Sequence, residues 1–66
     1  MNNNLTPKEI EILQLLAGGL VYKQAAAIAG CAKHTVAIHC TNIRDKLGAF
    51  NTTHAVAIAL RRGIIK

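Results

Sequence analysis

Residues 22–48 read YKQAAAIAGCAKHTVAIHCTNIRDKLG, and this stretch decides the fold. Its helix-forming residues and helical spacing of apolar side chains predict two helices, over residues 22–29 and 33–47. A glycine closes each helix, Gly30 the first and Gly48 the second. A short turn with glycine between two short helices is the helix-turn-helix unit.

Small and apolar residues allow the two helices to cross closely. Ala26 has little bulk, so the first helix of the pair can approach the second, and Val36 fills the angle between them. At 100° per residue, one side of the 33–47 helix is entirely apolar and is expected to face the core. This buried stripe consists of Val36, Cys40, Ile43 and Leu47.

The opposite side of the 33–47 helix mixes polar and apolar side chains and ends in an acid, Asp45. In a docked recognition helix, outward residues meet base edges and flanking polar residues meet phosphates. Thr35, Asn42 and Lys46 lie on one flank of this helix, and Arg44 lies on the other. The candidates for base contacts are His34, Ala37, Ile38 and Thr41. The candidates for phosphate contacts are Lys23, Lys33, Thr35, Asn42 and Lys46.

Two further helices are expected outside this unit. Thr6-Pro7-Lys8-Glu9 is a strong helix start, and Gly18-Gly19 ends that helix, which predicts a helix over residues 6–17. Asn51 and the two threonines after it can cap a last helix over residues 53–62. The predicted fold class is therefore all-α, with four short helices.

The last helix carries six apolar residues in succession, from Ala55 to Leu60. Val56 and Leu60 are expected to pack on the first helix, and the other side needs a second cover, which favours a homodimer. Arg61 and Arg62 are either phosphate contacts or a solvated helix end. The expected dimer-interface residues are His54, Ala57, Ile58 and Arg61.

The whole sequence is consistent with one small basic domain. The 66 residues carry a formal net charge of +5, which suggests an anionic partner, nucleic acid or a membrane surface. No apolar run approaches the length of a membrane span, and no signal peptide is evident, so we expect a cytoplasmic protein with reduced cysteines and no membrane partner. Residues 1–4 are expected to be a flexible tail, and residues 5–66 the domain. Lys8 and Lys66 are interpreted as ordinary surface charges.

Metal binding and catalysis are not expected. His34 and His39 would point about 140° apart on one helix, and Cys40 faces the core, so these residues do not form a zinc site. His39 flanks the buried stripe and is expected to make a structural hydrogen bond. No orienting group accompanies a Cys–His pair, so the sequence predicts neither an enzyme nor a cofactor.

Four segments carry a resemblance to a known family: LTPKEIEILQLLAGGL, HTV, HCTNIRDKLG and THAVAIALRRGII. Over residues 5–65 the chain resembles the LuxR/GerE-type (NarL/FixJ-like) helix-turn-helix DNA-binding domain. The resemblance implies a bacterial or phage transcription regulator that binds double-stranded DNA as a dimer, at the nucleoid, with the last helix at the two-fold axis. Apolar residues common in the family at Ala25, Ala29 and Cys31 are smaller here, and three further departures bear on DNA binding. Ala32 replaces a capping Ser or Thr, Ala37 replaces a base, and Asp45 is an acid where a base is frequent.

Two functions follow as hypotheses. The first is a dimeric, sequence-specific transcriptional regulator that reads its site mostly by steric contacts. The second is a protein-interaction module that pairs through its last helix with a full-length LuxR-type regulator, as a heterodimer, and inhibits it. We expect a stand-alone domain, and a fragment of a longer regulator is the alternative.

Overall fold

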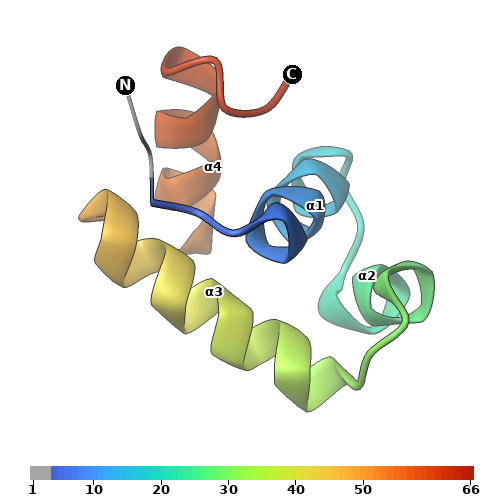
Figure 1. Cartoon of the computed structure of the whole chain (residues 1–66). Helices are drawn as coiled ribbons and strands as arrows, with labels where there is room; N and C mark the ends of the chain where they lie inside the picture. Colours follow the sequence, from blue (N-terminus) through green and yellow to red (C-terminus); the bar gives the residue numbers. More distant parts are fainter. Residues whose placement is uncertain (1–3) are drawn as a thin grey trace.

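The computed structural model describes residues 4–66, and Figure 1 shows its helices. Within this range the chain contains four helices and no strand, which confirms the predicted all-α class. In order along the chain the helices are α1 (Pro7–Ala17), α2 (Tyr22–Ala29), α3 (Lys33–Leu47) and α4 (Thr52–Arg61).

The helix boundaries agree closely with the sequence prediction. The bounds of α2 and α3 are those expected, whereas α1 begins one residue later and α4 is shifted by one residue toward the N-terminus. The shift of α4 has a local cause, because the Asn51 side chain accepts a 2.8 Å hydrogen bond from the His54 amide and so acts as the N-cap. Of the expected tail, residues 1–3 lie outside the described residues.

A reciprocal pair of hydrogen bonds begins α1. The Glu9 amide donates to Thr6 Oγ1 at 3.1 Å, and the Thr6 amide donates to Glu9 Oε1 at 2.9 Å. These bonds satisfy two amides that would otherwise lack partners at the helix start. The predicted start signal is therefore confirmed.

Glycines in the left-handed region end α2 and α3. Gly30 has φ of 75° and Gly48 has φ of 69°, a conformation that other residues adopt only with strain. Gly30 thus allows the sharp turn between α2 and α3, which the helix-turn-helix unit requires.

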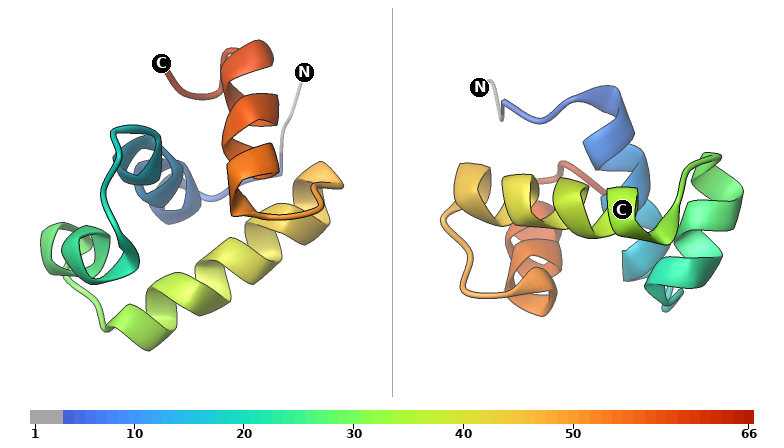
Figure 2. Two further views of the ribbon diagram at one scale, coloured as in Figure 1. Left: turned by 180° about the vertical axis from the view of Figure 1, so that it is seen from behind. Right: turned by 90° about the horizontal axis from the view of Figure 1, so that it is seen from below.

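The core is aliphatic and rich in alanine. The buried stripe of α3 is confirmed, with exposed fractions of 0% for Val36 and 5% or less for the other three residues. Val36 and Cys40 pack beside Ala26, while Ile43 and Leu47 pack beside α4. The remaining helices therefore lie on one side of α3, and its opposite side is left uncovered (Figures 1 and 2).

The packing of α4 differs from the prediction. Ala55 and Ala59 are fully buried, whereas Leu60 is 47% exposed and Val56 is half-buried. The expectation that Leu60 packs on the first helix is therefore wrong. The two alanines bring the α4 backbone close to its neighbours, and Leu60 lies about 100° further around the helix.

Two side chains of α1 connect distant parts of the chain. Lys8 Nζ donates to the Ala29 carbonyl at 2.9 Å and pairs with Glu11 at 3.2 Å, so Lys8 caps the end of α2 and is not the ordinary surface charge expected. Gln14 holds the backbone of Lys66 through bonds of 2.8 and 3.1 Å. In the described part of the chain, no helix has the length and hydrophobicity to cross a membrane.

Candidate nucleic-acid interface

The uncovered side of α3 presents the four base-contact candidates. His34, Ile38 and Thr41 are exposed, and Ala37 is half-buried. The exposed fraction of Ile38 is 48%, which is high for an aliphatic side chain in a small domain. We call the surface of His34, Ala37, Ile38 and Thr41 the recognition face. The position of the recognition face could be predicted from the buried stripe, because the face and the stripe occupy opposite sides of α3.

The hydroxyl of Thr41 is already engaged within the protein. Thr41 Oγ1 donates to the Ala37 carbonyl at 3.2 Å and accepts from Arg44 Nη2 at 3.3 Å. A threonine hydroxyl has a single proton, so Thr41 has none left to donate to a base. Its methyl group and one acceptor lone pair remain available.

The phosphate candidates lie along the flanks and at the helix starts. Lys23, Lys33 and Asn42 are exposed, and Thr35 is half-buried. The Ala32 N-cap has extended φ and ψ of −79° and 153° but offers no side-chain acceptor to α3. The first turn of α3 is therefore less stabilised than it would be with a Ser or Thr cap.

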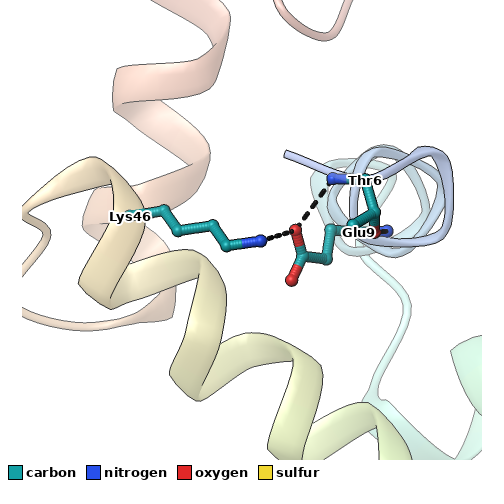
Figure 3. Close-up of polar contacts among 3 residues, drawn as sticks. All are labelled: Thr6, Glu9 and Lys46. Carbon is teal, nitrogen blue, oxygen red and sulfur yellow. Dashed lines mark hydrogen bonds and ion pairs between the residues drawn. The ribbon is translucent and has the colours of Figure 1, made fainter. Parts of the chain in front are cut away.

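Lys46 is the one phosphate candidate with a carboxylate partner. Its ammonium lies 2.8 Å from Glu9 Oε1, the same oxygen that accepts from the Thr6 amide (Figure 3). Glu9 is only 3% exposed. Burial raises the pKa of Glu9, but the hydrogen bonds from Lys46 and Thr6 and the charges of Lys46 and His39 lower the pKa more, so it lies below its ordinary value. Lys46 thus links α3 to the start of α1.

His39 does not make the structural hydrogen bond expected at its buried nitrogen. Nδ1 of His39 is buried without a hydrogen-bond partner among residues 4–66. The ring lies near enough to Glu9 to lower the pKa of that carboxyl. Within the described range, no three His, Cys, Asp or Glu side chains gather as metal ligands would.

The structure also contains a polar network that the sequence analysis missed. Arg44 Nη1 donates to Thr52 Oγ1 at 3.2 Å, and the Tyr22 hydroxyl meets the same oxygen at 3.0 Å. The network therefore joins α2, α3 and α4. The hydrogen bond with Thr52 lowers the pKa of Tyr22, but contact with Cys40 and burial raise it, so the net shift is upward and the phenol stays neutral. Thr52 is eight residues from Arg44 and Tyr22 is further away, so only the tertiary fold reveals this cluster.

The expected dimer-interface residues share one side of α4, because they are spaced three or four residues apart. Arg61 is exposed, and His54, Ala57 and Ile58 are half-buried. Beside them, Phe50 is 92% exposed and its ring stacks on His54, with centroids 5.2 Å apart and an interplanar angle of 17°. The Phe50 amide also donates to His54 Nδ1 at 3.0 Å. The exposed aromatic ring next to α4 was another feature missed from sequence.

Comparison with known proteins identifies the family to which this fold and sequence are similar. The profile of the GerE family, described as bacterial regulatory proteins of the luxR family, matches residues 3–59. The solved structure of the transcription factor GerE is similar over all of this chain and 97% of that one, with a TM-score of 0.92 and 30% identity. The structure of the phage VqmA–DPO complex is similar over 97% of this chain and 29% of that one, with a TM-score of 0.88 and 30% identity.

Curated relatives are longer proteins. The transcriptional regulatory protein YdfI of Bacillus subtilis is 43% identical over 61 residues, which is 92% of this chain and 29% of the relative. The transcriptional activator protein CarR of Pectobacterium carotovorum is 39% identical over 59 residues, 89% of this chain and 24% of the relative. The chain therefore spans less than a third of the length of these relatives.

Proposed function

The chain belongs to the luxR family of bacterial regulatory proteins, and on this premise we propose that it is a sequence-specific DNA-binding domain of a transcriptional regulator. In this proposal α3 enters the major groove of double-stranded DNA and α2 lies across the backbone. The relatives are regulators and not enzymes, so the chemistry to be explained is recognition.

The uncovered recognition face carries the proposal. The three other helices bury one side of α3 and leave Ile38 and Thr41 exposed on the other, although a small domain gains stability by burying an isoleucine. Lysines stand at the starts of both helices of the unit, Lys23 in α2 and Lys33 in α3. An exposed, protruding helix side with flanking cations suits a negatively charged groove.

Readout by the recognition face is mainly steric. Ile38 and Ala37 have no hydrogen-bonding side-chain atoms, and the only proton of the Thr41 hydroxyl is engaged. Apolar contacts of this kind favour thymine methyl groups, whereas guanine offers only acceptors to the groove. Thr35, Asn42 and the two lysines are proposed phosphate contacts. Lys46 is a weaker candidate, because its ammonium already pairs with Glu9.

A homodimer through α4 is the second part of the proposal. His54, Ala57, Ile58 and Arg61 would face the two-fold axis, with Phe50 beside them. Two recognition helices related in this way would enter successive major grooves, with half-site centres about 34 Å apart. The target would then be an inverted repeat.

Selection of bound duplexes from a random pool tests the proposal, with Ile38→Glu as the matched variant. The wild-type chain is expected to enrich an inverted repeat. Ile38→Glu should bind the enriched duplex at least about tenfold more weakly, because a carboxylate would stand against a groove lined by phosphates. Equal binding by the two folded proteins, or no enrichment, would contradict the docking of α3.

A protein-interaction module is a second candidate function. Phe50 is 92% exposed beside α4, and Asp45 places a negative charge on the outer side of α3. A chain with this surface would pair through α4 with a full-length LuxR-type regulator and block it. Failure to bind random duplex DNA, together with a heterodimer lost on Ala57→Glu, would favour this function over the first.

A further inference from the structure

Arg44 is held by one side chain of α4 and one of its own helix, α3. Its Nη1 donates to Thr52 in α4 at 3.2 Å, and its Nη2 donates to Thr41 one turn back in α3 at 3.3 Å. The Tyr22 hydroxyl of α2 contacts the same Thr52 oxygen at 3.0 Å. A guanidinium fixed at two of its nitrogens loses most of its freedom before any ligand arrives, which lowers the cost of binding.

No carboxylate balances this charge. Among residues 4–66, the ion pairs are Lys8–Glu11 and Lys46–Glu9, and the remaining acid, Asp45, pairs with no base. The partners of Arg44 are neutral hydroxyls, and its side chain is half-buried. A partly desolvated cation without a counter-ion favours an anion from outside the chain.

The unused donors of Arg44 suit a phosphate. A guanidinium has five N–H groups. Two of those of Arg44 donate to the hydroxyls of Thr41 and Thr52, and the other three have no acceptor among residues 4–66. The planar fork of an arginine matches two oxygens of a phosphate, which a lysine cannot do.

The position of Arg44 suits the DNA backbone. Arg44 follows Lys33 by eleven residues, so the two lie within about 20° of each other on α3. Lys23 directly follows Tyr22, the α2 residue of the same network. Lys33 and Arg44 therefore border the same flank of the recognition face, and Lys23 is a further exposed cation at the start of α2.

We propose that Arg44 is a phosphate-binding residue of the DNA interface, preorganised by Thr41, Thr52 and Tyr22. This inference rests on the proposed function and adds to it a contact that the sequence analysis assigned to no partner. It also gives the network a role, because the two threonines position the guanidinium and Tyr22 positions Thr52.

The salt dependence of binding to a random-sequence 20-base-pair duplex tests the proposal. Loss of one phosphate contact makes the slope of log K against log[salt] shallower by about 0.9. We expect this change for Arg44→Gln and no change for Lys66→Gln, which removes an equal charge at the far end of the chain. Thr52→Val should keep the wild-type slope and bind a few-fold more weakly at each salt concentration. A purely structural Arg44 would alter the melting temperature of Arg44→Gln but not the slope of its folded form.

A second measurement on the wild-type chain does not depend on the folding of any variant. Phenylglyoxal modifies arginines, and the chain has three, Arg44, Arg61 and Arg62. The same duplex is expected to protect Arg44 in a peptide map. An unchanged slope for Arg44→Gln, or equal modification of Arg44 with and without DNA, would overturn the inference while leaving the proposed function intact. Absence of any DNA binding by the wild-type chain would overturn both.

Discussion

Thr41 shows how an intrahelical hydrogen bond can determine what a side chain offers to DNA. Its hydroxyl donates to the Ala37 carbonyl and accepts from Arg44, so the methyl group is left as the distinctive feature. Threonine and valine differ by replacement of that hydroxyl with a methyl group, whereas serine keeps the hydroxyl and loses the methyl. Comparison of Thr41→Val with Thr41→Ser therefore distinguishes readout by the methyl group from readout by the hydroxyl.

At Thr41 we predict that valine is tolerated and serine is not. Thr41→Val should keep the base preference of the wild-type chain at the contacted position. Thr41→Ser should lose about fourfold in affinity for the preferred base, since a methyl-sized contact contributes roughly 0.8 kcal/mol. Fluorescence anisotropy with duplexes that differ at one base pair measures this. The opposite ranking of the two variants would show that the hydroxyl reads the base.

The Glu9–Lys46 pair is expected to contribute to stability. Glu9→Gln should lower the free energy of unfolding by about 1–2 kcal/mol, less than for a fully buried pair, because solvent screens the partly exposed lysine. Glu11→Gln, in the exposed pair with Lys8, should cost less than about 0.5 kcal/mol. Urea denaturation monitored by circular dichroism provides both values, and equal losses would contradict the special role of Glu9.

The contribution of Glu9 should depend on pH. The folded pKa of Glu9 is lowered, so its stabilising effect is present above its ordinary pKa, about 4.5, and is lost as the pH falls through the lower folded value. The difference between the wild-type chain and Glu9→Gln should therefore shrink on acidification. A difference that grows toward low pH would mean that the folded state raises this pKa.

At the residue scale, the features that could be predicted from the sequence are those that depend on residues close together in the chain. Thr6 with Glu9 and the buried stripe of α3 follow from positions three or four apart, and both were confirmed. Glu9, the partner of Lys46, and Thr52, one of the two partners of Arg44, lie in other helices, so no periodicity could reveal these contacts. The same is true of Lys8, which caps a helix that begins 14 residues later.

At the element scale, α3 begins with an N-cap residue whose side chain cannot accept a hydrogen bond. Ala32 already has the extended backbone that a capping residue adopts, so a hydroxyl there would meet the first amides of the helix. We predict that Ala32→Ser raises the free energy of unfolding by about 1 kcal/mol. Urea denaturation is again the measurement.

The same substitution inside a helix is the control for Ala32→Ser. Ala27 is exposed in the middle of α2, where serine has a lower helix propensity, so Ala27→Ser should destabilise the chain by about 0.5 kcal/mol. Destabilisation by both substitutions would show that the α3 start gains nothing from a cap.

The packing of α4 could not be predicted fully from its pattern. Six apolar residues in succession give no single apolar side, and the choice of Leu60 as an inward residue was wrong. The structure places the small residues Ala55 and Ala59 inside and leaves Leu60 exposed. Only small side chains fit where the α4 backbone lies close to its neighbours, and the place of that close contact is set by the other helices.

At the scale of the whole molecule, the surface around α4 determines the expected assembly. We predict that the wild-type chain forms a concentration-dependent dimer and that Ala57→Glu is monomeric, because two carboxylates would face each other across the two-fold axis. Ala27→Glu, on the exposed side of α2, is the matched control and should leave the dimer unchanged. Sedimentation equilibrium distinguishes these outcomes, and an unaltered dimer in Ala57→Glu would place the interface elsewhere.

The central claim is that the recognition face of α3 enters the major groove, and solution NMR of the isotopically labelled chain with duplex DNA tests it most directly. The largest chemical-shift changes are expected in α3 at His34, Ile38 and Thr41, with smaller changes at the start of α2, and they should weaken at higher salt. Changes confined to α4 and the Phe50 loop, or none at all with saturating DNA, would contradict the account.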